Sequence, residues 1–217
     1  SLSEIIKNFH NTIWRYENEF IPAVQADKAD RAVNCGEEIK FVMHRREDCK
    51  KLVELIEKGE LPLRVTHNDT KLNNVLFDSD SDDAICVIDL DTVMPGLALY
   101  DFGDSIRFGA NSCAEDDDNY DKVELMLDYF EAYAKGFLSE AGDALNQCEI
   151  DNLAFSAKLM TFECGMRFLT DYLNGDTYFK TAYPEHNLVR AKNQFALVAD
   201  MERKMEQMQQ IIKNITE

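Results

Sequence analysis

The segment between residues 64 and 91 holds the densest group of side chains that can do chemistry. Asp69 and Lys71 stand two residues apart. Asn74 follows five residues after Asp69, and Asp89 comes further along, directly after an apolar run that ends at Ile88. A carboxylate can accept a proton from a hydroxyl, an amide oxygen and a second carboxylate can share a hard cation, and an ammonium group can neutralise a phosphoryl group. Together these parts predict phosphoryl transfer, because its loose transition state is stabilised mainly by positioning and charge neutralisation.

Two short apolar runs, residues 75–77 and 84–88, predict the β-hairpin that positions these groups. A polar, acidic stretch separates the runs, as expected for a turn. Antiparallel pairing of the runs would bring Asn74 and Asp89 side by side at the open end of the hairpin. Asp69 lies on the loop that leads into that end. We therefore expect a base and two cation ligands in one place.

The rest of the chain has mainly helical periodicity. Apolar residues recur at helical spacing in five segments, which are 11 to about 59, 101–108, 120–138, 150–173 and 187–215. The stretch Met94–Gly96 contains Pro and Gly and is predicted to be a loop. We predict an α+β fold that is predominantly helical, with one small β-hairpin carrying the catalytic loop.

Net charge restricts the possible partners. The chain has 23 Lys and Arg residues against 41 Asp and Glu residues, a formal charge of −18. Such a field repels nucleic-acid backbones and anionic membrane surfaces, so we expect neither as a partner. An anionic substrate such as a nucleotide would need metal ions or well-placed cations. The sequence has neither a run of about 20 apolar residues nor a signal-peptide pattern after Ser1, so we expect the protein in the cytoplasm.

The six cysteines give no sign of a metal site or a disulfide framework. They are widely spaced along the chain, and none forms a C-x-x-C pair. Most of them fall within apolar periodic segments, so we expect buried free thiols.

The segment His67–Asn74 also resembles a known motif. Its pattern, H-x-D-x-K-x-x-N, resembles the catalytic loop of the protein-kinase-like fold. The flanking sequences VIDLD and YDFGD look like those of the aminoglycoside phosphotransferases, which phosphorylate small molecules. Within that group, similarity to the N-acetylhexosamine 1-kinases lies in the stretches RVTHNDTKLNNVLFD, VIDLDTVMPGLALYDFGDSIRFGAN and ECGMRFLTDYLNGDTYF. The resemblance covers the chain from about Phe9 to the final helix.

This resemblance implies a role for each residue of the predicted site. Asp69 would be the catalytic base and would hydrogen-bond the anomeric hydroxyl of N-acetylglucosamine or N-acetylgalactosamine. Asn74 and Asp89 would be ligands of Mg²⁺, with ATP as the phosphoryl donor. Lys71 would act beside Asp69 and support the transferring group.

The resemblance also implies roles for residues outside the hairpin. Arg167 and Tyr178 fall where the sugar kinases contact the hexosamine, and His67 and Asp101 would brace the catalytic loop. Asp101 begins a literal D-F-G triplet, the metal-binding signature of protein kinases, but it lies beyond the hairpin and opens a helix. We therefore assign the metal to Asp89, which directly follows an apolar strand.

The sequence departs from a complete kinase before His67. That part contains no glycine-rich strand-turn-strand, no P-loop and no strand lysine. We therefore expect residues 1–217 to form the C-terminal catalytic and substrate-binding lobe, with the N-terminal nucleotide-binding lobe absent from this chain. Such a lobe would bind ATP weakly and turn over little by itself.

Other functions remain open at this stage. The same fold could phosphorylate choline, homoserine or an aminoglycoside, or this chain could be a non-catalytic interaction lobe. The D-x-D pair Asp89 and Asp91 could serve a glycosyltransferase, but the α/β nucleotide-binding sheet of such enzymes is not apparent. Without the resemblance, Arg167 would be interpreted as an ordinary surface or ion-pair arginine.

Overall fold

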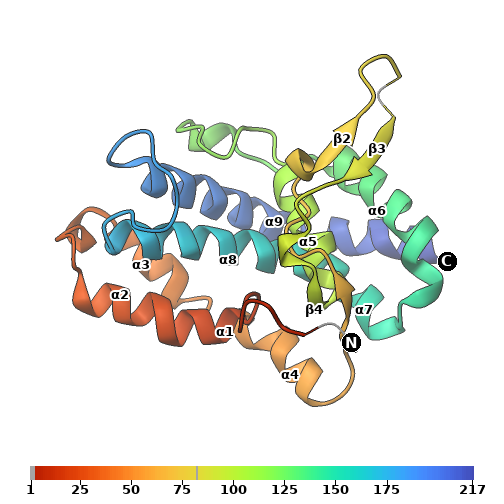
Figure 1. Ribbon diagram of the computed structural model, residues 1–217, viewed down its shortest axis with the longest axis horizontal. Coiled ribbons are helices and arrows are strands. Elements are labelled where there is room, and N and C mark those ends of the chain that lie inside the picture. Colours follow the sequence, from red (N-terminus) through yellow and green to blue (C-terminus); the bar gives the residue numbers. More distant parts are fainter. Residues whose placement is uncertain (1–2, 82) are drawn as a thin grey trace.

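The centre of the fold is helix α8, Leu153–Leu173. This helix is apolar on nearly all faces, and most of its residues are buried. It packs against α9, His186–Thr216, and against α5, Ala98–Gly109. Figure 1 shows α8 and α9 side by side in the computed structural model, which describes residues 3–81 and 83–217.

The N-terminal third is helical but broken into short segments. Its helices are α1 Thr12–Arg15, the π-helical Tyr16–Phe20, α2 Ile21–Ala26, α3 Gly36–Met43, α4 Lys51–Glu57, and the 3₁₀ turns Ala32–Asn34 and Asp48–Lys50. The predicted helical pattern over 11–59 is therefore wrong as a continuous element. Pro22 has no N–H to give to the preceding turn, which is π-helical, and Asp27 ends α2 in the left-handed conformation with φ of 37°.

Two antiparallel strand pairs lie beside the helices. Strand β2, Val75–Phe77, pairs with β3, Ala84–Val87, with the first residue of β2 opposite the last residue of β3, so the predicted hairpin is confirmed. Strand β1, Arg64–Thr66, pairs with β4, Met94–Gly96. The prediction of a loop at Met94–Gly96 is wrong, because a three-residue strand that contains Pro has no alternating pattern to detect.

The remaining helices differ from the prediction mainly at their starts. They are α6 Leu127–Ala141, α7 Gln147–Asp151 and the 3₁₀ turns Leu72–Asn74, Leu90–Thr92, Tyr120–Lys122 and Gly142–Ala144. The helix predicted over 120–138 begins only at Leu127. Its first part is the 3₁₀ turn Tyr120–Lys122 followed by a non-helical stretch, in which Leu125 is buried and forms a β-bridge with Asn111.

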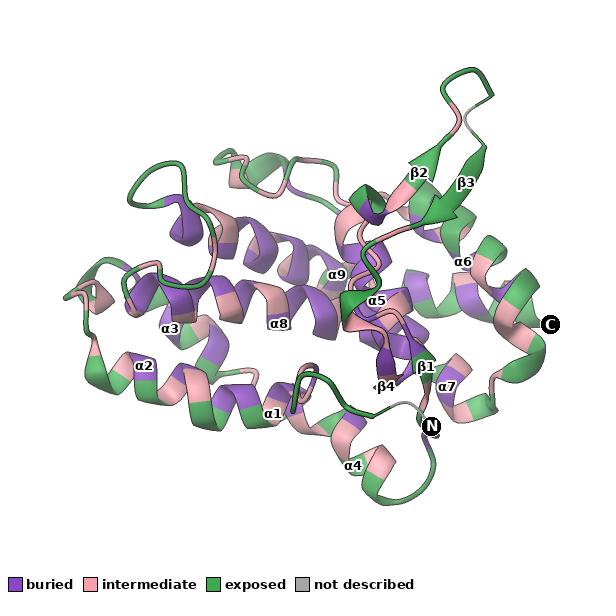
Figure 2. Ribbon diagram, in the orientation of Figure 1, coloured by how far each residue is buried: buried purple, intermediate pink, exposed green. Residues whose placement is uncertain are grey.

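Burial follows the same arrangement. Figure 2 shows buried residues concentrated along α5, α8 and α9, whereas the β2–β3 hairpin is mostly exposed. All six cysteines are free, but only Cys35 and Cys49 are buried, and Cys86 on β3 is exposed. The expectation of buried thiols is therefore wrong for Cys86, because its strand projects from the helical body. No helix in the described ranges is long and apolar enough to cross a membrane.

The D-F-G triplet serves helix packing. Phe102 is fully buried in the core. A Cβ atom added at Gly103 would lie 2.5 Å from the backbone oxygen of Ser156 and 2.6 Å from Cγ of Met160, so α5 and α8 approach closely only because this residue has no side chain. The triplet therefore lies inside a helix, where no strand end presents it to a metal.

We predict that Gly103→Ala lowers the free energy of unfolding by about 1–3 kcal/mol, because the added methyl group overpacks the α5–α8 contact. Gly136→Ala in α6 is the matched control, since a Cβ there meets nothing within 4 Å. That control should raise the free energy of unfolding by up to about 1 kcal/mol through helix propensity. Urea denaturation of both variants measures the difference, and equal effects would contradict the close approach at Gly103.

Candidate functional site

The catalytic loop is held by the carboxylate of Asp101 in the first turn of α5. Its Oδ2 accepts the backbone N–H of His67 at 2.9 Å, and its Oδ1 accepts that of Asn68 at 2.7 Å. The Thr70 hydroxyl donates to the Asp101 carbonyl oxygen at 2.6 Å. Burial raises the pKa of the Asp101 carboxyl, and the two backbone hydrogen bonds oppose that rise. The first turn of a helix also favours a negative charge.

His67 ties the same loop to the end of β3. Its Nε2 lies 3.0 Å from the carbonyl oxygen of Ile88, and the backbone N–H of Asp69 donates to its Nδ1 at 3.3 Å. A carbonyl oxygen can only accept, so Nε2 carries the hydrogen and the ring is neutral. Asp101 thus contacts the backbone of the catalytic loop, and the His67 side chain links this loop to the residue that follows β3.

Two residues of the site adopt the left-handed backbone conformation without being glycine. Asn68 has φ of 67° and Asp89 has φ of 61°. The Asn68 side chain is fixed by Nδ2 hydrogen bonds to the carbonyl oxygens of Thr66 and Thr92, at 3.2 and 3.0 Å. Asn and Asp tolerate this conformation better than other residues, and such strain concentrates at functional sites.

Asp69, Lys71 and Asn74 form one hydrogen-bonded group. Lys71 Nζ donates to Asp69 Oδ2 at 2.9 Å. Asn74 Nδ2 donates to the Asp69 carbonyl oxygen at 2.8 Å and to Asp69 Oδ2 at 3.0 Å. Among the residues that the structure describes, no donor contacts Asp69 Oδ1 or Asn74 Oδ1. Each of these two oxygens is therefore open to another partner.

The donor set at the base of the hairpin fits a magnesium ion. The backbone N–H of Ile88 donates to the Asn74 carbonyl oxygen at 2.9 Å, and Asp89 follows directly with an exposed carboxylate. Mg²⁺ commonly takes one or two protein oxygens and completes its octahedron with waters and phosphates, so Asn74 and Asp89 have the oxygen chemistry that such an ion requires. The described part of the chain has no cluster of three or more His, Cys, Asp or Glu side chains suited to a metal.

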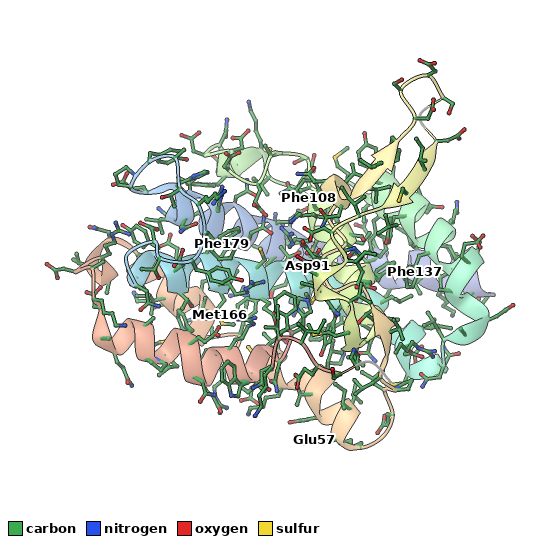
Figure 3. The ribbon with its side chains drawn as sticks, viewed as in Figure 1. Glu57, Asp91, Phe108, Phe137, Met166 and Phe179 are labelled. Carbon is green, nitrogen blue, oxygen red and sulfur yellow. The ribbon has the colours of Figure 1, made fainter. Side chains whose placement is uncertain are left out.

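A cavity of about 480 Å³ brings distant parts of the sequence together. Asp69 and Lys71 line it together with Arg167 of α8 and Tyr178 of the loop before α9. Figure 3 labels two aromatic residues of its wall, Phe108 of α5 and Phe179 beside Tyr178. Asn74 and Asp89 are outside this lining. Asp69 and the two residues expected to contact a sugar thus line one cavity, whereas Asn74 contacts Asp69 from outside the lining.

Arg167 is held by aromatic rings. Its guanidinium carbon lies 5.3 Å from the ring centre of Phe9, 5.9 Å from that of Tyr178 and 5.5 Å from that of Phe179. Within the described ranges no carboxylate lies at ion-pair distance from it, which argues against an ordinary ion-pair role. A cation at aromatic faces retains its hydrogen-bond donors for a ligand.

Asp171 positions Tyr178, and sequence reasoning missed it. Helix α8 is followed by a turn at Gly175, whose φ of 92° sends the chain back. The Asp171 carboxylate then accepts the backbone N–H groups of Tyr178 and Phe179, each at 2.9 Å, and the side chain of Asn187. A carboxylate in the last turn of a helix opposes the helix dipole. This unfavourable position of a carboxylate is the sequence feature that could have pointed to a role for Asp171 in holding the following loop.

The cavity wall is electrically balanced although the chain is strongly acidic. Its Lys and Arg residues are Lys71, Arg107, Arg167, Lys180 and Arg190, its Asp and Glu residues are Asp69, Asp104, Glu115 and Glu163, and His10 also lines it. Placing five of the 23 cations against four of the 41 carboxylates favours neutral or anionic ligands over cationic ones.

A buried charge pair at this wall also holds the catalytic loop. His10 Nδ1 lies 2.8 Å from Glu163 Oε1, and its Nε2 lies 3.0 Å from the carbonyl oxygen of Asn68. Because both neighbouring atoms are acceptors, this position suits an imidazole ring that donates from both nitrogens. Burial acts to raise the pKa of Glu163, but the charge and hydrogen bond of His10, with Arg15 and Thr12, lower it to about 2.

Comparison with known protein families gives one match. The family described as "APH: Phosphotransferase enzyme family" matches residues 7–136, more than half of the chain. The matched range includes the catalytic loop, the hairpin and Asp101. Arg167 and Tyr178 lie outside it.

We predict that Glu163→Gln lowers the free energy of unfolding at pH 7 by an amount on the order of 3 kcal/mol, because His10 loses its buried charge partner. Since the pKa of Glu163 is depressed in the folded state, its contribution is present above its ordinary pKa of 4.5 and is lost as pH falls toward 2. The difference between wild type and variant should shrink over that window. Chemical denaturation at several pH values measures it.

Glu57→Gln is the control, because Glu57 is exposed at the end of α4 (Figure 3). Its effect should stay within about 0.5 kcal/mol at every pH. A Glu163→Gln variant as stable as this control would contradict the charge pair.

Proposed function

Because the chain belongs to the phosphotransferase enzyme family, we propose that it transfers the γ-phosphoryl group of ATP to the anomeric hydroxyl of an N-acetylhexosamine. The observation that carries the proposal is the shared cavity. Asp69 and Lys71 of the catalytic loop line it with Arg167 and Tyr178, which come from elements much later in the chain. A base and polar contacts for an acceptor are what an alcohol needs in order to be held and deprotonated.

Asp69 is the proposed base. Its Oδ2 is held by Lys71 and Asn74, whereas Oδ1 is open to accept the proton of the acceptor hydroxyl. As the hydroxyl oxygen bonds to the γ-phosphorus, the bond to the ADP oxygen breaks and the proton moves to Asp69. Lys71 keeps a positive charge beside the transferring group, and the loop anchors at Asp101 keep the base in position.

Asn74 Oδ1 and Asp89 are the proposed ligands of the Mg²⁺ that accompanies ATP. The hydrogen bond from Asn74 Nδ2 to Asp69 directs the amide nitrogen inward, which leaves the amide oxygen for the ion. Mg²⁺ bound there would neutralise phosphate charge that this acidic chain otherwise repels. A reaction that uses ATP is compatible with the cytoplasmic location that we propose.

We propose that residues 1–217 act as the catalytic and substrate lobe of this enzyme. The parts that cover the phosphates of ATP, a glycine-rich turn and a strand lysine, have no counterpart before His67. A separate nucleotide-binding lobe would supply them. Exposed apolar side chains on both faces of the hairpin, such as Leu76 and Val87, support a partner at the hairpin.

A neutral sugar is favoured over a cationic alcohol as the acceptor. The balanced charge of the wall, with Arg167 between aromatic rings, opposes choline or an aminoglycoside and tolerates a sugar. Tyr178 is 69% exposed and presents its ring and hydroxyl to the cavity region.

We predict that Asp69→Asn in the complete enzyme lowers kcat by about 10²–10⁴-fold, because an amide cannot accept the proton. Affinity for N-acetylglucosamine should stay within a few-fold, since the other cavity residues remain. Steady-state kinetics and calorimetry measure the two quantities. Asp80→Asn, in the exposed turn of the hairpin, is the matched control and should keep full activity. Near-normal turnover by Asp69→Asn would remove Asp69 from the mechanism.

A panel of acceptors tests the substrate class. N-acetylglucosamine or N-acetylgalactosamine should give a kcat/KM at least about 100-fold above those of choline, homoserine and an aminoglycoside. ADP release and phosphorus NMR of the product identify the phosphorylated hydroxyl. A preference for any cationic acceptor would contradict the assignment to a sugar, and turnover of none would leave a binding lobe as the better interpretation.

A further inference from the structure

Two buried side-chain atoms in the described part of the chain lack a hydrogen-bond partner, and both belong to residues of the same cavity. They are Oδ2 of Asp104 and Nε of Arg190. Asp104 on α5 and Arg190 on α9 both line the cavity that contains Asp69. Buried polar atoms in native proteins nearly always have a partner. One acceptor and one donor without partners at a single cavity therefore leave two polar atoms that a bound polar molecule can satisfy.

Asp104 lies close to the catalytic loop. It stands one turn after Asp101 on the same face of α5, and its neighbour Ser105 donates from Oγ to the carbonyl oxygen of Thr70 at 3.1 Å. Thr70 directly follows Asp69. An acceptor molecule held at Asp69 therefore lies on the same side of α5 as Asp104.

The local charges make the orphan oxygen a strong acceptor. Arg107 Nε donates to Asp104 Oδ1 at 2.8 Å, and Arg107 Nη1 donates to Glu115 Oε1 at 2.5 Å. One buried cation thus serves two carboxylates, and Asp104 Oδ2 receives nothing from it. Hydrogen bonds to a charged group are about twice as strong as neutral ones.

A second buried aspartate in the protein has hydrogen-bond partners for both of its carboxylate oxygens. Asp200 on α9 is also buried and also pairs with an arginine three residues later, Arg203, at 2.9 Å. Its second oxygen accepts the backbone N–H of Leu125 at 2.7 Å. At Asp104, Arg107 Nε holds one oxygen but the second oxygen has no donor, and Asp104 is the one of the two aspartates that lines the cavity.

We propose that Asp104 selects the acceptor. Its Oδ2 accepts a hydrogen bond from an O–H or N–H group of the molecule that Asp69 deprotonates, and Arg190 Nε donates to an oxygen of the same molecule. The acceptor class is then a neutral polyol that presents both a donor and an acceptor away from its reacting hydroxyl. This inference rests on the proposed function.

The test combines a variant with substrate analogues. Wild type, Asp104→Asn and the control Asp200→Asn, each in the complete enzyme, are assayed with N-acetylglucosamine, its monodeoxy derivatives and glucose, which lacks the acetamido group. The amide at position 104 keeps the shape of the side chain but loses its charge. Asp104→Asn should lower kcat/KM for N-acetylglucosamine by about 10- to 100-fold, mainly through KM.

The analogue series locates the partner of Asp104. For one analogue, the kcat/KM of wild type should be about 10- to 100-fold below that for N-acetylglucosamine. For the same analogue, Asp104→Asn should lower kcat/KM by less than about threefold, because this analogue lacks the group that hydrogen-bonds Asp104. Asp200→Asn should match wild type on every substrate. An equal loss by Asp104→Asn on all analogues would overturn the inference while leaving the phosphotransferase intact. Absence of turnover by wild type would overturn the proposed function, and the inference with it.

A crystal structure of the wild-type protein with N-acetylglucosamine gives a readout that does not depend on how the variants fold. A sugar O–H or N–H within about 3.2 Å of Asp104 Oδ2 is expected. Sugar bound at Asp69 with Asp104 Oδ2 still lacking a donor would refute the assignment.

Discussion

The path of the catalytic loop depends on one carboxylate that accepts hydrogen bonds from the loop backbone. Asp101 accepts two successive amides of the loop with its side chain and a hydroxyl with its carbonyl oxygen, so residues 67–70 wrap around the first turn of α5. His67 then fixes the other side of the loop to the end of β3. With both flanks held, Asp69 faces the cavity without needing contacts of its own to the helical body. The position of Asp69 therefore depends on the hydrogen bonds that the first turn of α5 makes to the loop.

Sequence reasoning succeeded where the signal was local. The hairpin and the long helices α8 and α9 were predicted because alternating or helical periodicity extends over their whole length. The pairing of β1 with β4 was missed, since two very short strands on either side of the hairpin carry no such pattern. The helix expected from residue 120 starts late because Leu125 finds a long-range partner, which local periodicity cannot reveal.

The same distinction applies to the site. The spacing of Asp69, Lys71 and Asn74 was informative because these residues lie on one short loop and contact one another. Arg167 was proposed only from resemblance, since nothing near it in the sequence indicates the aromatic rings that surround it. Asp104 was missed because an aspartate three residues before an arginine is typical of a helix-surface ion pair. Its proposed role rests on a side-chain oxygen that has no hydrogen-bond partner, which the sequence cannot show.

The exposed β2–β3 hairpin has a practical consequence. The two proposed cation ligands sit at its base, where the 3₁₀ turn Leu72–Asn74 and the left-handed Asp89 connect to the helical body. The outer end of the ribbon makes no comparable contribution, since its strands are largely exposed. A fluorescent reporter inserted at this tip would therefore be attached far along the ribbon from the proposed cation ligands.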